Sequence, residues 1–307
     1  MRETIFRTGA AAFAVALAVM VGVPMVATGA NAAEGEKKMP IMIERKTCTA
    51  PDGVTIVYSA AGAGEPALVF IHGGLAERSF YDGQLEAFAG KHRVIALDLA
   101  GHGESGANRA KWGVPAWSED VRAVVNAERL PRVILFGNSL GGPVAIEAAL
   151  LLQDRVIGVV GVDTFQRLDH TVTPEEARQR AETLCADLPA GVHAMMKQLF
   201  HPDADPAVVA DAERRMQKSP PDAVYAMFMS LAGYNEAAAA RSLAAPLRAI
   251  NGDLWPTDVE GVRKIHPDFQ VAIIKHTGHY PMLERPKEFN RRVKDVVKEL
   301  TRQAKPR

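Results

Sequence analysis

The sequence RVILFGNSLGG at residues 132–142 decides the fold, because a β-prone apolar run passes through a tight turn into a helix-prone stretch. The turn Gly137-Asn-Ser139-Leu-Gly141 fits the pattern G-x-S-x-G, which holds its middle residue in a strained conformation and projects the side chain away from the sheet. Gly137 and Gly141 lack the side chains that would collide with the neighbouring strand or helix. The pattern predicts that Ser139 is a nucleophile at a helix N-terminus, where the helix dipole favours negative charge.

Around this turn, short β-rich runs alternate with helical stretches, which is typical of an α/β protein with a mostly parallel sheet. Several of the runs are continuous in Val, Ile and Leu, as expected of strands that are covered on both faces. The expected strands are residues 41–49, 54–60, 67–72, 93–97, 132–136, 156–162, 247–251 and 269–274, and the expected helices are residues 81–89, 116–128, 140–152 and 284–303. The first two strands are expected to form a hairpin around a Pro-Asp-Gly turn.

Residues 164–245 interrupt this alternation, since they contain no clear strand. Prolines divide the segment into short helices, so we expect a helical cap packed over one end of the sheet. The α/β core would then consist of two parts, residues 33–163 and 246–307. Methionines within the cap suit either an adaptable apolar pocket or ordinary packing between cap and core: Met195, Met196, Met216, Met227 and Met229.

The first 32 residues have the composition of a secretory signal peptide. Arg2 and Arg7 precede an apolar run at residues 9–27, and Ala-Asn-Ala follows at residues 30–32. Cleavage after Ala32 would leave a secreted or periplasmic protein without stable membrane insertion. The alternative is an uncleaved N-terminal membrane anchor, because the apolar run is about as long as a bilayer span.

Charge and cysteine content disfavour two other classes of protein. The 307 residues include 36 Lys and Arg against 36 Asp and Glu, so the formal net charge is zero. A general nucleic-acid binder needs a surplus of clustered basic residues, and we expect no nucleic-acid partner. Two cysteines, Cys48 and Cys185, are too few for a disulfide scaffold or a cysteine-based zinc site. We expect both to be unpaired.

A second motif, VFIHGGL at residues 69–75, ends the third expected strand. A nucleophilic serine needs an oxyanion hole, which consists of two backbone N–H groups that face the carbonyl oxygen as it gains charge. Leu140, the residue after the nucleophile, would supply one donor, and Gly74 would supply the other. His72 is expected to anchor this loop rather than to act in catalysis.

A third motif, KHTGHYPMLERP at residues 275–286, lies between the last expected strand and the last expected helix. A serine hydroxyl is a poor nucleophile until a neighbouring imidazole accepts its proton. His279 is the best candidate for this base. His276 forms an H-x-x-H pair with it, but two loop histidines without a third ligand are weak evidence for a metal site. The sequence implies neither a metal nor an organic cofactor.

These motifs make the chain resemble an α/β-hydrolase with a helical cap, over about residues 41–303. The stretch LDLAGHGES at residues 97–105 is similar to the D-x-x-G-x-G-x-S loop of that family. This loop is structural in the family, so Asp98 and His102 are expected to have structural roles. The order of nucleophile first and histidine last also matches. The resemblance implies a doubly wound, mostly parallel eight-stranded sheet with the helical cap inserted after strand six.

The acid of the implied Ser-His-Asp triad departs from the usual pattern of this family. It usually follows strand seven as G-x-x-D, where this chain has Trp255 at the expected position and Asp253 two residues earlier. The other known location is the end of strand six, as in haloalkane dehalogenases and their relatives, where this chain has Asp163. Either carboxylate would orient His279 and stabilise its imidazolium form. We favour Asp163, with Asp253 as the alternative acid.

The resemblance implies a carboxylesterase-like serine hydrolase that cleaves a carboxylic ester or a similar small acyl substrate through an acyl-enzyme. Dehalogenation is excluded on this interpretation, because it needs an Asp nucleophile where this chain has Ser139. The elbow Gly-Asn-Ser-Leu-Gly-Gly also resembles those of C–C bond hydrolases and cofactor-free peroxidases, which use the same triad. A further alternative is a non-catalytic ligand-binding member of the fold, which the intact Ser139 and His279 disfavour. The sequence leaves the substrate and the oligomeric state open.

Overall fold

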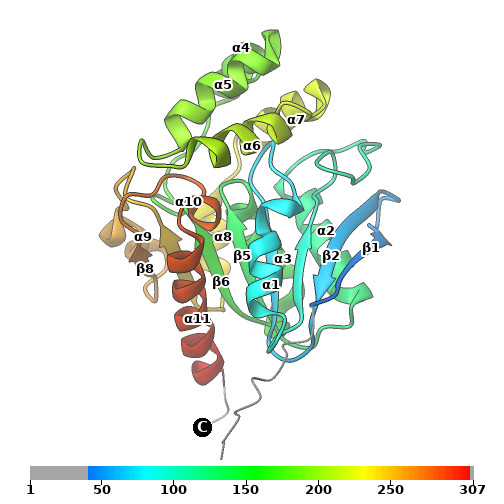
Figure 1. Cartoon of the computed structure of the whole chain (residues 1–307), viewed down its shortest axis with the longest axis vertical. Coiled ribbons are helices and arrows are strands. Elements are labelled where there is room, and N and C mark those ends of the chain that lie inside the picture. Colours follow the sequence, from blue (N-terminus) through cyan, green and yellow to red (C-terminus); the bar gives the residue numbers. More distant parts are fainter. Residues whose placement is uncertain (1–40, 305–307) are drawn as a thin grey trace, which may run out of the picture. The chain divides into compact units, whose positions relative to one another are not determined.

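A mostly parallel sheet forms the centre of the part of the chain that the computed structural model describes, residues 41–304 (Figure 1). Eight strands lie in the order β1-β2-β4-β3-β5-β6-β7-β8. Strand β2 is antiparallel to both of its neighbours, and the other neighbouring pairs are parallel. The strands are β1 (Ile43–Thr49), β2 (Thr55–Ala61), β3 (Ala67–Ile71), β4 (Val94–Leu97), β5 (Val133–Asn138), β6 (Val156–Val162), β7 (Leu247–Asn251) and β8 (Gln270–Ile273). The predicted eight-stranded α/β architecture is confirmed.

Helices cover both faces of this sheet. On one face α3 packs on β5 and β6 and against α2, whereas on the other α11 packs on β6 and β7 and against α1. Every residue of β3, β5 and β6 is buried, which explains why these strands are continuous apolar runs. The core helices are α1 (Asp82–Phe88), α2 (Val114–Ala127), α3 (Gly141–Leu152), α9 (Val259–Ile265), α10 (Pro281–Glu284) and α11 (Pro286–Gln303), with 3-10 turns η1 (Arg78–Tyr81) and η2 (Gln153–Arg155).

The helix expected at residues 284–303 is divided in two in the structure. Arg285 separates α10 from α11 and has φ −136° and ψ 57°, outside the helical region. Proline disfavours helical geometry in the residue before it, and Pro286 therefore ends one helix while starting the next. The apolar face of α11 then faces the core through residues at helical spacing: Phe289, Val293, Val296, Val297 and Leu300.

Helices fill the chain between β6 and β7, where the sequence contains no clear strand. They are α4 (Pro174–Ala186), α5 (Leu188–Leu199), α6 (Pro206–Met216), α7 (Pro221–Leu231) and α8 (Glu236–Ser242). Figure 1 shows α4 to α7 together at one end of the sheet, while α8 packs against α3. Each of α4 to α7 has a proline in its first two positions, where a missing N–H costs no hydrogen bond. We call α4 to α7 and their connections the cap.

Two further sequence predictions concern the cysteines and the N-terminus. Cys48 and Cys185 are both free, as predicted. The predicted signal segment, residues 1–32, lies outside the described residues. Within residues 41–304, no helix combines the length and the apolar character needed to cross a membrane.

Candidate active site

The turn between β5 and α3 holds Ser139 in the conformation that its motif predicts. Its φ of +50° lies in the left-handed region, which residues with a side chain rarely adopt. A Cβ atom on Gly137 would collide with the backbone of Gly141, and a Cβ atom on Gly141 would lie 2.5 Å from the carbonyl oxygen of Ile71. Both positions therefore require glycine. The turn leaves Ser139 half-buried at the carboxyl edge of the sheet.

His279 lies in the loop between β8 and α10 and contacts a buried carboxylate. Its Nδ1 is 2.7 Å from Oδ2 of Asp163, which directly follows β6. Asp163 is 2% exposed, and its Oδ1 accepts a hydrogen bond from the Gly252 N–H at 2.9 Å. The His279 side chain is 12% exposed. With the Nδ1 proton donated to Asp163, Nε2 is left as the ring nitrogen that can accept a proton.

Asp253, the alternative acid of the sequence analysis, has other partners. Its Oδ1 accepts a hydrogen bond from the Thr277 N–H at 3.1 Å, and its Oδ2 lies 3.7 Å from Lys275 Nζ. The Asp253 N–H also donates to the Thr277 carbonyl oxygen at 3.0 Å. Asp253 thus connects the loop after β7 to the loop that carries His279. The structure places Asp163, and not Asp253, against the imidazole.

A buried amide, Asn138, joins the segments that carry these side chains. Its Nδ2 donates to the Val162 carbonyl oxygen at 2.7 Å and to the His279 carbonyl oxygen at 2.9 Å. Because Val162 precedes Asp163 and Asn138 precedes Ser139, one side chain fixes the serine, acid and histidine segments relative to one another. Sequence reasoning gave Asn138 no role; the available signal was a polar residue at the end of an apolar strand. Within residues 41–304, no hydrogen bond joins Ser139 to His279, and such bonds often tighten only when substrate binds.

The loop after β3 passes beside the nucleophile. A Cβ atom on Gly73 would lie 3.1 Å from the Ser139 Cβ, and Leu75 has a positive φ of +60°. The N–H groups of Gly74 and Leu140, the two predicted oxyanion donors, donate no hydrogen bond to another residue of the described chain. A side chain on Gly74 would collide with Met227 of α7. This cap methionine therefore lies directly against the predicted oxyanion loop.

His72 supports this loop from inside the core. The ring is fully buried, and its Nε2 accepts a hydrogen bond from the Leu99 N–H at 3.0 Å. Burial lowers the pKa of His72 to about 4, so the ring is neutral at pH 7. The ring therefore connects the loop after β3 to the loop after β4, in agreement with the expected structural role.

The cap holds the His279 loop through backbone groups. The His279 N–H donates to the Leu199 carbonyl oxygen, at the end of α5, over 2.7 Å. The Glu284 carboxylate accepts hydrogen bonds of 2.9–3.0 Å from three backbone N–H groups, those of His201, Gly278 and Tyr280. Burial raises the pKa of Glu284, and the three donors oppose this shift. Sequence reasoning missed this residue, because its partners are backbone groups that leave no pattern in the side chains.

The turn that carries Ser139, the imidazole–carboxylate pair and the mostly parallel sheet together define a protein of the α/β-hydrolase class. The sequence matches the model of the alpha/beta hydrolase family over residues 68–292, and the chain belongs to this family.

The curated relatives match only part of the chain in sequence, whereas several solved structures share its fold at low sequence identity. An uncharacterized protein of Mycobacterium tuberculosis is 36% identical over 108 residues, which are 34% of this chain and 31% of that protein. The chain thus spans about a third of the length of the first curated relatives that it matches. An esterase from Thermogutta terrifontis has a TM-score of 0.74 at 23% identity, over 84% of this chain and 99% of that chain. A protein described as a putative aryl esterase from Burkholderia cenocepacia has a TM-score of 0.72 at 26% identity, with the same coverage.

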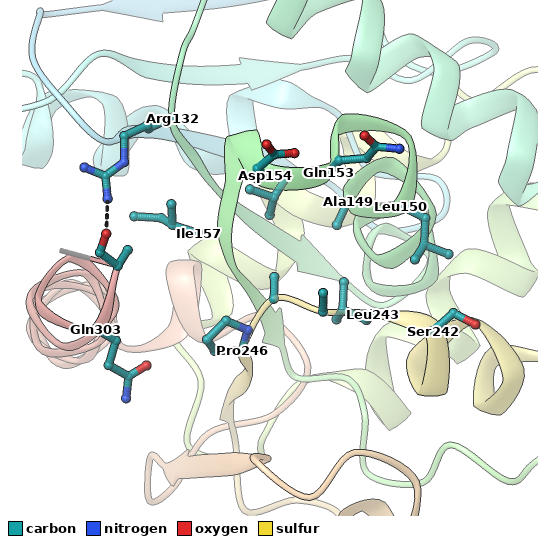
Figure 2. A pocket seen from close by; sticks show the side chains of 14 residues that line it. Arg132, Ala149, Leu150, Gln153, Asp154, Ile157, Ser242, Leu243, Pro246 and Gln303 are labelled. Carbon is teal, nitrogen blue, oxygen red and sulfur yellow. Dashed lines mark hydrogen bonds between the residues drawn. The ribbon is translucent and has the colours of Figure 1, made fainter. Parts of the chain in front are cut away.

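A pocket of about 740 Å³ lies away from this site, near the amino ends of β6 and β7 (Figure 2). The end of α3, the connection from α8 to β7 and the end of α11 line it. Arg132, at its rim, donates a hydrogen bond to the Ala304 carbonyl oxygen at 3.4 Å. Ser139, Asp163 and His279 lie instead at the carboxyl ends of the strands, where open α/β sheets bind their ligands. This pocket is therefore separate from the candidate active site.

Proposed function

We propose that this protein is a serine hydrolase that cleaves a carboxylic ester or a similar small acyl substrate. The observation that carries the proposal is the 2.7 Å contact between His279 and the buried Asp163, at the sheet edge where Ser139 sits in a strained turn. An imidazole oriented by a carboxylate activates a serine hydroxyl, which is otherwise a weak nucleophile. The likeness to the esterase-type structures named above supports the same reaction class.

The reaction begins when the Ser139 Oγ attacks the carbonyl carbon of the ester and gives its proton to Nε2 of His279. Asp163 on Nδ1 stabilises the imidazolium that forms. The N–H groups of Gly74 and Leu140 hold the oxygen that gains negative charge. The C–O bond to the alcohol then breaks, and His279 returns the proton to the leaving oxygen.

The second half of the reaction releases the acyl group. Water attacks the acyl-enzyme while His279 again accepts a proton. The bond to Ser139 Oγ then breaks and His279 returns the proton to that oxygen, which leaves the free acid and the Ser139 hydroxyl. The cap is expected to set the size and shape of the acyl group, because Met227 lies against the loop that carries Gly74. Neither half of this reaction needs a metal or an organic cofactor.

The test compares p-nitrophenyl acetate and butyrate hydrolysis by the wild type and by Ser139→Ala. Loss of a catalytic serine costs up to about 10⁶-fold in kcat, so the variant should fall to the background rate. Ser242→Ala, at the end of α8, is the matched control and should keep the wild-type rate. A phosphonate probe should add its mass to Ser139 in the wild type.

Hydrolysis that persists in Ser139→Ala, or a phosphonate attached elsewhere, would contradict the proposed nucleophile. Labelling of Ser139 without ester turnover would instead favour the C–C hydrolase or peroxidase alternatives on the same triad. Absence of both labelling and turnover would favour a ligand-binding member of the fold.

We also propose that the enzyme acts outside the cytoplasm after cleavage of residues 1–32, on the basis of their composition. Mass spectrometry of the exported protein should find an N-terminus near Ala33. An intact Met1 in the membrane fraction would contradict cleavage and favour an N-terminal anchor.

A further inference from the structure

Three side chains of types that can ligate a metal ion meet where the cap joins the His279 loop. His201 and Asp203 follow α5 of the cap, and His276 lies in the loop after β8. One ligand atom from each residue lies within 4.8 Å of the other two. Nδ1 of His276 is 2.9 Å from Oδ2 of Asp203, and Nδ1 of His201 is 3.6 Å from the same oxygen. The H-x-x-H pair of His276 and His279 is therefore not the group that could bind a metal. His276 instead contacts Asp203 of the cap, which lies 73 positions earlier in the sequence.

The spacing of these atoms suits a small divalent ion. Zinc binds imidazole nitrogen and carboxylate oxygen at about 2.0–2.2 Å in tetrahedral geometry, which places neighbouring ligand atoms about 3.3–3.5 Å apart. The two measured separations, 2.9 and 3.6 Å, lie on either side of this range. We propose that His201, Asp203 and His276 bind one divalent transition-metal ion of the Zn²⁺ class, with solvent at the remaining position.

The backbone that carries these ligands is already held in place. The His201 N–H donates to Oε2 of Glu284 at 2.9 Å, and Nε of Arg285 donates to the His276 carbonyl oxygen at 3.1 Å. Metal sites gain affinity when rigid elements hold their ligands before the ion arrives. The ion would form a further connection between the cap and the His279 loop, beside the backbone hydrogen bond from His279 to Leu199 and the hydrogen bonds of Glu284.

Access and protonation set the conditions for binding. The side chains of His276 and Asp203 are 68% and 54% exposed, so an ion reaches them directly from solvent. Nδ1 of His201 accepts a hydrogen bond from the Asp203 N–H at 3.1 Å, and coordination through that nitrogen would replace this bond. The imidazoles bind metal only when they are neutral, so affinity should fall as the solution becomes acidic.

The test is isothermal titration calorimetry of the untagged protein with ZnCl₂, after treatment with EDTA and dialysis. The wild type should bind one ion per chain. His276→Ala should bind at least about 10-fold more weakly, because even changes to outer partners of a metal site cost about 10–100-fold. The matched control is His193→Ala, which removes an exposed histidine that pairs with Glu213 inside the cap. This variant should bind like the wild type.

A second readout separates metal binding from folding. Zinc should raise the melting temperature of the wild type and of His193→Ala more than that of His276→Ala, since an ion that binds the folded state stabilises it in proportion to its affinity. Because His276 is exposed, His276→Ala without zinc should melt like the wild type without zinc. His279→Ala should retain zinc binding.

Three results would overturn the site. The first is equal zinc affinity in the wild type and in His276→Ala. The second is the absence of saturable binding to the wild type. The third is loss of binding in His279→Ala, which would place the ion on the candidate catalytic histidine instead. None of these outcomes depends on ester hydrolysis, so the metal site and the proposed function can fail separately.

Discussion

Asp163 and Asp253 follow neighbouring strands of the sheet, but only Asp163 contacts His279. We therefore expect substitutions of the two residues to differ in their effect on catalysis. Asp163→Asn should lower kcat by about 10⁴-fold, because the amide favours the wrong tautomer of His279. Asp253→Asn is the matched control, since it changes a carboxylate that binds the Thr277 backbone. It should stay within about 10-fold of the wild type, as expected when transition-state contacts are intact. Steady-state hydrolysis of an aryl ester measures both, and the reverse ranking would assign the acid to Asp253.

The same pair shows what could be predicted at the scale of residues. Ser139 and His279 could be singled out because each lies in a local motif whose spacing carries its own geometry. The acid could not be decided, because β6 and β7 are neighbouring parallel strands whose carboxyl ends meet at one edge. The choice depends on the path of the loop that carries His279. That path is set by Asn138, Leu199 and Glu284, whose partners are backbone atoms.

At the scale of elements, the short helix α10 links the cap to the His279 loop through Glu284. Glu284→Gln keeps the size of the side chain but offers a single acceptor oxygen where the carboxylate accepts three N–H groups. We expect a loss of about 1.5–3 kcal/mol in the free energy of unfolding, the usual range for a hydrogen bond to a charged group. We also expect a lower kcat, because the His279 loop is held less firmly.

Urea unfolding and ester hydrolysis measure the two effects of Glu284→Gln. The matched control is Glu288→Gln in the first turn of α11, where the carboxylate pairs with surface arginines. Exposed pairs of this kind contribute about 0–1 kcal/mol, so this variant should remain close to the wild type in both measurements. Equal stability of the two variants would mean that Glu284 does not hold the junction.

Most elements could be located from the sequence, and the exceptions have physical reasons. The central strands are distinct apolar runs, and the edge strand β1 is joined to β2 by a Pro-Asp-Gly turn, so the predicted strands lie within a few residues of the observed bounds. Helix α9 was missed because its seven residues bury one side chain, Val262, which is too little for a helical periodicity. The arrangement of the cap over the sheet could not be predicted, because its contacts with the His279 loop are largely hydrogen bonds to backbone groups.

For the whole molecule, ionisable side chains whose pKa is shifted by the fold contribute to how the free energy of unfolding changes with pH. Burial lowers the pKa of His72 to about 4 and that of His102 to about 3, below the ordinary histidine value. The unfolded chain therefore binds protons that the folded chain does not, and stability falls as pH decreases from about 6.5 towards 4. Glu236, at the start of α8, acts in the opposite direction. Burial raises its pKa to about 8, and its Oε1 has no hydrogen-bond partner among the described residues.

The sign for Glu236 follows from its raised pKa. Folding favours the protonated acid, so its contribution is fully present below about pH 4.5 and is lost as pH rises through about 8. The combined contribution of these three groups is largest near pH 6.5, and on the alkaline side Glu236 contributes a decline of up to about 1.4 kcal/mol per pH unit.

Glu236→Gln should remove that alkaline decline, because the amide does not ionise. We expect the free energy of unfolding in urea to fall less between pH 6.5 and pH 9 for Glu236→Gln than for the wild type. The absolute stability at pH 5 also reflects how well the amide packs, so the difference in slope is the result that matters. Glu182→Gln, an exposed position on α4, is the matched control and should keep the wild-type slope. Parallel pH profiles for Glu236→Gln and the wild type would show that folding does not raise the pKa of the Glu236 carboxyl group.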